Sequence, residues 1–479
     1  MGKKTLIFLA AMLLIMGATT AMAEVGTGEV TAKSGDVDIN IFGSLKTYPH
    51  FMNNADFNDD DTDFDWLLDE SGYLDDDTVT VRTEARLGFA GKGKNWNFMA
   101  ILEGDFVFDK NNTDRGARAN EIDDDIGMTG EDFGIEKLEY TYDFSSHGAP
   151  MTLETGWNTK WLDIETGGLL YGDDHPYIGL KGTINDIAWE ALSLFIYDDA
   201  GTVGLGDADQ QDWEAYTLRF SFPVQDLKVM PFYAYSHNKA MDADVHYLGA
   251  QTFGKLGKLT PRAEFVYAYG DKDDYIGGDD ADISAWAAFA ALEVNVSEMI
   301  NPYFGGQIIT GDDNANDDDI EAYNPITNIA RYTPTFGMEN AFIYRLVPVL
   351  GSHLYSNDTT MLGANGGYGG ISNSAKAESP GMYSMGLGTK GKEGKFSYKT
   401  QFQYFWFEET GALEDLEGIS IDDEIGWEFD LQLTYHFTNH FSIGNVISIF
   451  DPGDGIEDLR GPDFDETAYL DTIELIWTF

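Results

Sequence analysis

Strict alternation of apolar and polar residues is the feature of this chain that most constrains its fold. From Ile425 to Phe437 the sequence reads IGWEFDLQLTYHF, and every odd-numbered position carries an apolar or aromatic residue. Because successive side chains of a β-strand point to opposite faces, this stretch predicts one strand with an apolar face and a polar face. Its 13 residues exceed the usual strand of about 5–6 residues and fit the roughly 9–11 tilted residues that cross a bilayer.

The same alternation recurs along the chain, and helical periodicity is nowhere sustained. We count eighteen strands between 37–49 and 466–479, with sixteen as the alternative because a few segments are weakly patterned. The links alternate between short ones, such as GKGKN at 91–95, and long ones, such as 50–77. The sequence therefore predicts an all-β fold, a transmembrane antiparallel β-barrel with long extracellular loops and short periplasmic turns.

The N-terminus has the three-part pattern of a secretory signal peptide. Two lysines precede an apolar run from Leu6 to Met16, and an A-x-A site ends at Ala23. A membrane anchor needs about 20 apolar residues, so this run is too short for one. We expect a signal peptide at 1–23 and one barrel domain at 24–479, exported through the periplasm to the outer membrane of a Gram-negative bacterium.

Composition excludes several classes of function. The net charge is −54, with 83 acidic residues against 29 Lys and Arg, which excludes binding of the nucleic-acid phosphate backbone as the main function. It contains no Cys, which excludes disulfides, thiolate metal sites and cysteine nucleophiles. The link 50–77 is acidic throughout and has no Lys or Arg. Acidic loops of this kind should concentrate cations at the channel mouth.

From Ile473 the last strand carries apolar residues at every second position up to Trp477 and Phe479, although Asp471 lies on the same face. These positions fit the lipid-facing side of a closing strand, and the two aromatic rings fit the girdle at the membrane interface. The terminal Phe479 also resembles the C-terminal signal that the barrel-insertion machinery recognises.

Together these features resemble an outer-membrane porin, and the order of segments resembles the homotrimeric porin family of sulfate-reducing and related anaerobic bacteria. The similar stretches are EARLGF at 84–89, ILEGDF at 101–106, GIEKLEYTY at 134–142, DLKVMPFYAY at 226–235 and PYFGGQIITGDDNAND at 302–317. The resemblance implies a homotrimer in outer-membrane lipid. It also implies a water-filled channel for passive diffusion of small hydrophilic solutes and ions, and the net charge favours cations.

Two alternatives remain open at this stage. An alginate-export-like channel for polysaccharide, or another substrate-specific channel, shares the barrel architecture, although an anionic polymer would favour a basic lumen. A structural or adhesive barrel would not conduct, and a barrel-embedded hydrolase would need a Ser and His pair at the outer rim. The sequence has no GxSxG or HExxH motif, and we predict that the protein is not an enzyme.

Polar side chains on the inward faces of the strands are candidates to line the pore. Opposed acidic and basic groups at a constriction would select solutes by charge and dipole, whereas the alternative is an ordinary solvated wall. The candidates are Arg82, Glu84, Arg86, Glu103, Asp105, Lys137, Glu139, Lys160, Lys395, Lys399, Glu428 and Asp430.

The link 311–380 is too long for a turn. Its middle, RYTPTFGMENAFIYRLVPVL, is rich in aromatic and apolar residues and includes Arg331 and Arg345. In water this stretch would be an exposed apolar patch. We therefore expect it to fold into the barrel as a constriction loop, to contact a neighbouring subunit, or to form a small core over the rim.

One acidic cluster has a weak metal-binding pattern. Asp59, Asp61, Asp63 and Glu70 occupy positions 1, 3, 5 and 12 of an EF-hand count, but Phe64 replaces the glycine of the sharp turn. A looser Ca²⁺ or Mg²⁺ site that bridges to lipopolysaccharide is one interpretation, and plain solvation is the other. No other cofactor is expected.

Overall fold

The computed structural model describes residues 30–34, 37–54, 57, 79–107, 129–197, 212–239, 242–276, 279–314, 316–327, 332–341, 379–462 and 464–479. The expected signal peptide 1–23 lies outside these residues, as do Asp59, Asp61, Asp63, Glu70, Arg331 and Arg345. Over the described residues, no helix is long and apolar enough to cross a membrane.

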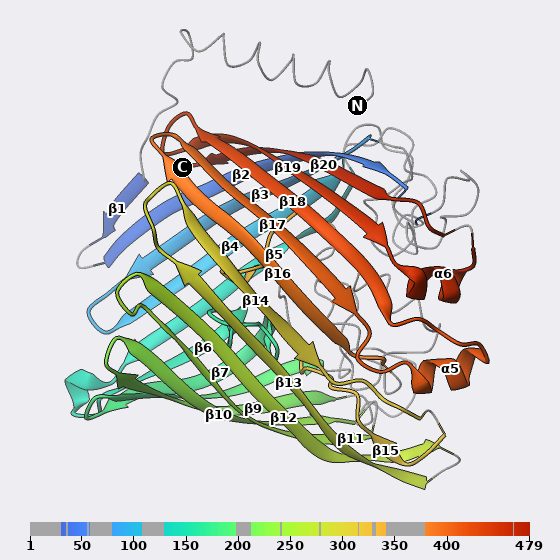
Figure 1. Ribbon diagram of the computed structural model, residues 1–479. Helices are drawn as coiled ribbons and strands as arrows, with labels where there is room; N and C mark the ends of the chain where they lie inside the picture. Colours follow the sequence, from blue (N-terminus) through green and yellow to red (C-terminus); the bar gives the residue numbers. More distant parts are fainter. Residues whose placement is uncertain are drawn as a thin grey trace.

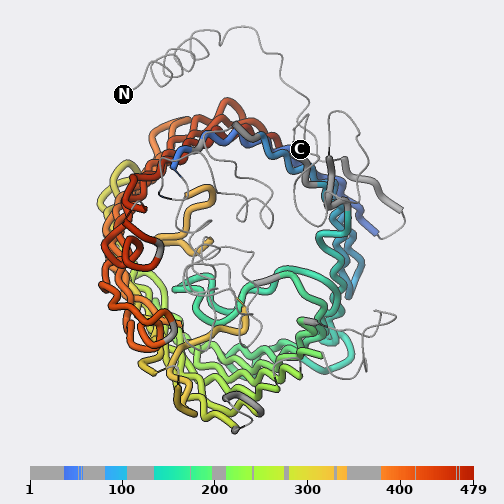
Figure 2. Tube along the Cα trace, turned by 90° about the vertical axis from the view of Figure 1, so that its right-hand side faces the viewer, coloured from blue at the N-terminus to red at the C-terminus, as the bar shows by residue number. Residues whose placement is uncertain are grey.

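The strands form one closed antiparallel barrel (Figures 1 and 2). Of the twenty strands, β1 (Val30–Ser34) and the two-residue β15 (Asp319–Ile320) lie outside the wall, which leaves eighteen in it. The barrel closes where β2 pairs with β20, from Ser44 opposite Thr478 to Asn53 opposite Tyr469. The prediction of eighteen strands is confirmed. In chain order the wall consists of β2 (Val37–Asn53), β3 (Val79–Lys92), β4 (Trp96–Val107), β5 (Thr129–Asp143), β6 (Met151–Trp161), β7 (Gly172–Ile184), β8 (Ile187–Tyr197), β9 (Trp213–Val224), β10 (Leu227–Asn238), β11 (Ala243–Gly254), β12 (Leu259–Ile276), β13 (Asp279–Val294), β14 (Asn301–Ile309), β16 (Met382–Glu393), β17 (Phe396–Trp406), β18 (Glu424–His436), β19 (Phe441–Pro452) and β20 (Ala468–Thr478).

Tight turns gather at one end of the barrel. The β7–β8 and β9–β10 turns contain only two residues each, and Asn185 and Gln225 adopt φ of 55° and 56° there. Turns with positive φ match the right-handed twist of the flanking strands, and asparagine tolerates this conformation well. A 3₁₀ turn at Ser145–His147 makes the β5–β6 link. The short helices α5 (Gly411–Glu417) and α6 (Asp454–Arg460) lie in links at the opposite end (Figure 1).

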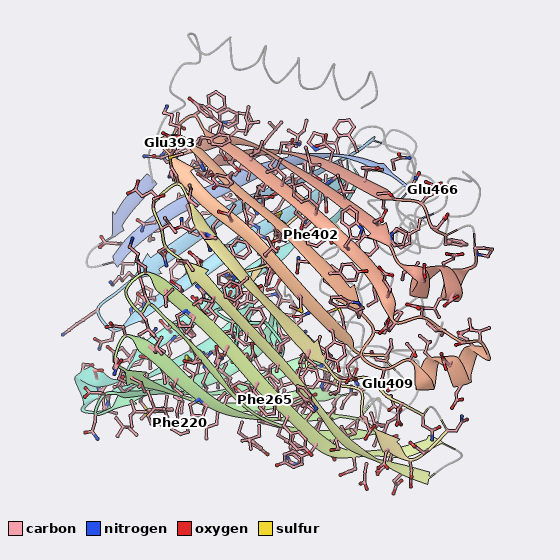
Figure 3. All side chains as sticks on the ribbon, viewed as in Figure 1. Phe220, Phe265, Glu393, Phe402, Glu409 and Glu466 are labelled. Atoms are coloured by element: carbon pink, nitrogen blue, oxygen red, sulfur yellow. The ribbon has the colours of Figure 1, made fainter. Side chains whose placement is uncertain are left out.

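Apolar side chains cover the outer face of the wall. Phe265 and Phe402, labelled in Figure 3, are exposed, as expected for groups that face lipid. At the closing seam, the backbone N–H and C=O of Phe479 both bond to Gly43, at 3.0 Å each. The Trp477 ring stacks on Phe441 with 4.4 Å between ring centroids. The C-terminal aromatic residues thus complete the seam from the outside.

Candidate functional site

Part of the barrel interior is filled by the β6–β7 link, residues 162–171. The Glu264 Oε2 atom on β12 accepts hydrogen bonds from the Thr166 hydroxyl at 2.7 Å and from the Gly167 N–H at 2.9 Å. On β11, the Gln251 side chain donates to the Leu162 carbonyl oxygen at 2.5 Å. The inward faces of neighbouring strands therefore hold this link inside the wall.

A second stretch, residues 321–327 and 332–341, also lies inside the ring, and we call it the crossing segment (Figure 2). Near β7, the Gly172 N–H donates to the Thr327 carbonyl oxygen at 2.9 Å. Near β17, the Gln401 side chain donates to the Phe336 carbonyl oxygen at 3.0 Å. Counted from β2, β7 is the sixth strand of the wall and β17 the fifteenth, so they stand nine strands apart in a barrel of eighteen. The crossing segment therefore spans the lumen from one side to the other.

The two sides of the crossing segment differ in how they are filled. Apolar side chains fill the part next to β8–β14, where the inward faces pack against the two internal segments. The buried side chains there include Leu169, Leu194, Trp213, Phe232, Val245, Tyr247, Val266, Ile283, Phe289, Tyr303, Tyr323 and Ile326. Beyond β17, Met338 and Ala341 pack on Val446 of β19, and the Asn340 amide donates to Glu474 of β20 at 3.0 Å. Within the described residues, cavities open along the inward faces of β2–β7 toward the end with the short turns, whereas Tyr48 and His50 of β2 are buried.

Charged groups of both signs contact one another on the inward faces of β2–β5. The Arg86 guanidinium contacts three carboxylates, with Nε 3.0 Å from Glu84 and 2.6 Å from Glu103, and Nη2 3.0 Å from Glu136. The Lys46 ammonium also pairs with Glu84, at 2.7 Å. Because Arg86 and Glu84 each have several partners, the cluster is a network and not a set of separate surface pairs.

A second network continues the first around the wall. The Lys160 ammonium lies 3.3 Å from Glu139 and 3.2 Å from Glu154. The Lys181 ammonium on β7 lies 2.6 Å from the other oxygen of Glu154. The Asn158 amide donates to Glu139 at 2.7 Å. These contacts tie β5, β6 and β7 together through their inward side chains.

At two of these ion pairs the two signs of charge differ in how far they reach into the lumen. The Glu84 and Glu154 side chains are 3% and 1% exposed, whereas Arg86 and Lys181 are 32% and 46% exposed. At these two pairs the carboxylate lies against the wall and the cation extends over it. The order is reversed between Lys160 and Glu139, which are 14% and 22% exposed, so Arg86 and Lys181 are the cations that reach furthest toward a passing solute.

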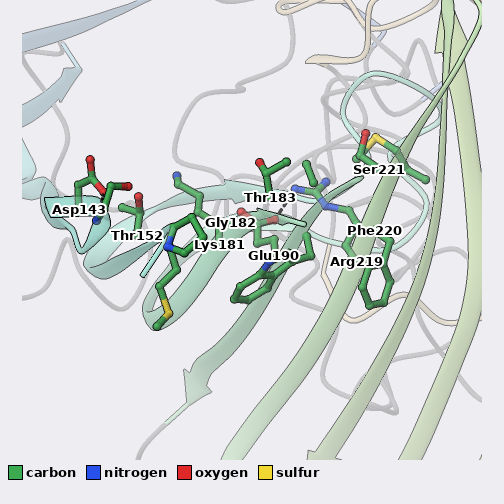
Figure 4. Close-up of a pocket in the computed structure, with 15 residues that line it drawn as sticks. Asp143, Thr152, Lys181, Gly182, Thr183, Glu190, Arg219, Phe220 and Ser221 are labelled. Carbon is green, nitrogen blue, oxygen red and sulfur yellow. Dashed lines mark hydrogen bonds and ion pairs between the residues drawn. The ribbon is translucent and has the colours of Figure 1, made fainter. Parts of the chain in front are cut away.

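A cavity of about 540 Å³ opens beside Lys181 (Figure 4). Its lining includes the hydroxyls of Thr183 and Ser221 and an ion pair between Arg219 and Glu190. A second cavity of about 750 Å³ shares Thr152 and Lys181 with the first and runs along the inward faces of β2–β7. Lys181 therefore stands where the two cavities meet, near the end of the barrel that carries the short turns.

The structure places six of the sequence candidates in these networks or beside them. They are Arg82, whose guanidinium lies over the Tyr48 ring, and Glu84, Arg86, Glu103, Glu139 and Lys160.

Two further candidates lie on the same strands. Lys137 is opposite Ile101, which is two residues from Glu103 on the same face. The backbone of Asp105 is opposite Glu84, but its side chain is outside the described part.

Other candidates require correction. Glu428 and Asp430 face inward but are 0% exposed, and both accept from the Ser448 hydroxyl, so they do not line open space. Asp430 also accepts from the Gln401 side chain, which donates to the crossing segment. Lys399 is covered in the same way, since its ammonium donates to the Gly337 carbonyl oxygen of that segment. Lys395 is not on a strand. It lies in the β16–β17 turn and donates to the Phe437 carbonyl oxygen.

Several charged residues of the networks were missed by sequence reasoning. Lys46 and Lys181 follow the alternation of their strands and could have been found from it. Glu136 could not, because the β4–β5 register shifts between Ile101 and Leu102 and places it next to Arg86. A β-bulge of this kind moves the inward phase by one residue and leaves no clear trace in the sequence.

One titratable group outside the wall fastens the start of the link 311–380. The Asp312 carboxylate accepts the backbone N–H groups of Asn314 and Glu321, at 3.1 Å each. Burial raises the pKa of Asp312 to about 6. These two hydrogen bonds hold the chain where it folds back toward the crossing segment, and the same fold shields the Asp312 carboxylate from water.

Comparison with known proteins places the architecture. No protein-family model matches the chain. No curated protein sequence matches it either. Solved structures do resemble it. They include a BenF-like porin from Pseudomonas fluorescens Pf-5, with a TM-score of 0.53 and 10% identity over 93% of this chain and 98% of the other. Two more are OpdK of Pseudomonas aeruginosa, solved with vanillate, and OccAB2 of Acinetobacter baumannii. Each has a TM-score of 0.50 and 10% identity over 92% of this chain and 98% of the other.

These structures share the fold and little of the sequence. The barrel of this chain thus has the same fold as these solved porin structures.

Proposed function

We propose that this protein is an outer-membrane porin that forms a water-filled channel for passive diffusion of small hydrophilic solutes and ions. The observation that carries the proposal is the charged inward wall of β2–β6, along which a cavity extends to Lys181. At this strand number a barrel is wide enough to hold an aqueous channel. The crossing segment acts as the constriction.

The charge distribution supports a weak preference for cations. Loss of 1–23 removes two lysines and no acidic residue, so the net charge changes from −54 to −56. Such a charge draws cations to the mouth. The exposed tips of Arg86 and Lys181 oppose it inside. Reversal potentials in a salt gradient test this balance, and a strong anion preference would contradict it.

A substrate-specific channel is the second candidate. The 540 Å³ cavity is lined by fixed donors and acceptors, including Lys181, Glu190 and Arg219, which could orient one class of solute. Block of the ion current by a specific solute at low concentration would favour this candidate over general diffusion. A current that depends only on solute size would favour the general porin.

We also propose a homotrimer in the outer membrane. On the lipid side of the seam, the Asn445 amide donates to the Asp471 carboxylate and to the Thr472 carbonyl oxygen. A carboxylate on a lipid-facing surface is costly, and contact with a second copy of the chain would shelter it. Crosslinking of the native protein tests the proposal, and a monomer that remains monomeric in lipid would contradict it. Outer-membrane localisation is tested by membrane fractionation.

A further inference from the structure

Two lysines face each other on the inward side of the wall. Lys390 of β16 lies directly opposite Lys399 of β17. Like charges in directly opposed positions destabilise a strand pair. The arrangement therefore requires acceptors that offset the repulsion.

Carbonyl groups of the crossing segment supply most of these acceptors. The Lys399 ammonium donates to the Gly337 carbonyl oxygen at 2.7 Å, and the Lys390 ammonium donates to the Pro334 carbonyl oxygen at 3.2 Å. Lys390 also pairs with Glu293 at 2.7 Å. Both ammonium groups lie over the Tyr303 ring, at 5.9 Å for Lys390 and 5.7 Å for Lys399.

The same ring supports the crossing segment from below. The Phe336 side chain meets Tyr303 edge-on, with 5.6 Å between ring centroids. The Tyr303 hydroxyl donates to Gln401, which in turn donates to the Phe336 carbonyl oxygen. The lysines, the ring and the amide thus form one connected anchor at the β17 end of the crossing segment.

We propose that Lys390 and Lys399 are positioning residues that clasp the crossing segment to the wall and thereby set the width of the channel. This inference rests on the proposed porin function. The clasp works through backbone carbonyls, so it depends on a cationic donor at each position and not on the side-chain sequence of residues 334–337. Loss of either donor releases the β17 end of the segment into the lumen.

The chain offers a matched control. Lys392 lies two residues from Lys390 on the same face and lines the same cavity of about 360 Å³. In the described part of the chain its side chain makes no hydrogen bond to the crossing segment. The variants Lys390→Met, Lys399→Met and Lys392→Met therefore each remove one lumen charge, but only the first two remove a clasp. Lys399→Arg keeps a charged donor.

Hydrogen exchange of the purified, detergent-folded barrel reads the clasp directly. Loss of a charge-assisted hydrogen bond increases the equilibrium constant for local opening by about tenfold or more. We expect exchange at 332–341 to accelerate by about that factor in Lys390→Met and Lys399→Met, and to stay near the wild-type rate in Lys392→Met and Lys399→Arg. Single-channel conductance and current noise should rise in the same two variants.

The outcomes separate the clasp from the porin proposal. Equal exchange at 332–341 in all three methionine variants would overturn the clasp, as would acceleration that extends equally over the β16–β17 ladder. A wild-type barrel that conducts while the clasp variants conduct like Lys392→Met would overturn it as well, yet would leave the porin in place. A folded wild-type barrel that never conducts would instead defeat the proposed function, and the exchange measurement would still judge the clasp.

Discussion

Replacement of Lys181 by Met tests whether exposed cations govern the field along the wall. Lys181 is the more exposed partner of its ion pair, and Glu154 keeps Lys160 at 3.2 Å when Lys181 is removed, so the fold should tolerate the change. A unit charge acts on a monovalent ion about 5 Å away with about 0.8 kcal/mol in water. That energy corresponds to about a fourfold change in local ion concentration, and salt screening reduces it.

The assay is the reversal potential of single channels in a potassium chloride gradient. Removal of the charge raises the local concentration of potassium and lowers that of chloride, so we expect the ratio of potassium to chloride permeability to rise in Lys181→Met, by up to about sixteenfold at low salt. Lys258→Met is the matched control, because Lys258 is an exposed residue of the β11–β12 turn and lies away from the wall networks. An unchanged reversal potential in a Lys181→Met channel that still conducts would refute the reasoning, as would an equal shift in the control.

Three further predictions concern stability and assembly. Glu264→Leu removes the acceptor of two hydrogen bonds to 162–171, which should lower the local stability of that link by about 2–3 kcal/mol and make protease cleavage there faster. Thr166→Val removes only one of the two bonds and should have a smaller effect. Asp312 has a folded pKa of about 6, above its unfolded value of about 3.8, so the folded state holds the proton more tightly and stability should fall as the pH rises through 6. Asp312→Asn should flatten that dependence in urea unfolding of the detergent-solubilised barrel, and an unchanged slope would contradict the assignment. Phe479→Ala removes the ring that lies over Gly43 at the seam, and it should lower the yield of heat-modifiable barrel on denaturing gels, whereas a normal yield would show that the ring is dispensable.

The wall of the barrel could be predicted from the sequence because one physical rule governs it. Lipid on the outside demands apolar side chains at every second position, and this signal is plain in β17 and β18. The rule also placed Arg82, Glu84 and Arg86 on the inward face, because their neighbours Ala85 and Leu87 must face lipid. Strand number followed from the spacing of the turns.

The interior could not be predicted in the same way. Around Leu192 and Leu194 both faces of β8 are apolar, because the inward face packs on internal segments instead of water. The apolar stretch within 311–380 allowed a fold into the barrel as one of three alternatives, and nothing in the sequence chose among them. Glu428 and Asp430 have a clean inward phase, yet both proved to be buried.

Single-channel recording of the wild-type protein in planar bilayers is the decisive measurement for a porin. We expect stepwise, lasting ionic currents from the folded barrel, with a conductance that rises when the clasp of Lys390 and Lys399 on the crossing segment is removed. A barrel that is heat-modifiable and membrane-inserted but passes no current would contradict the proposed function.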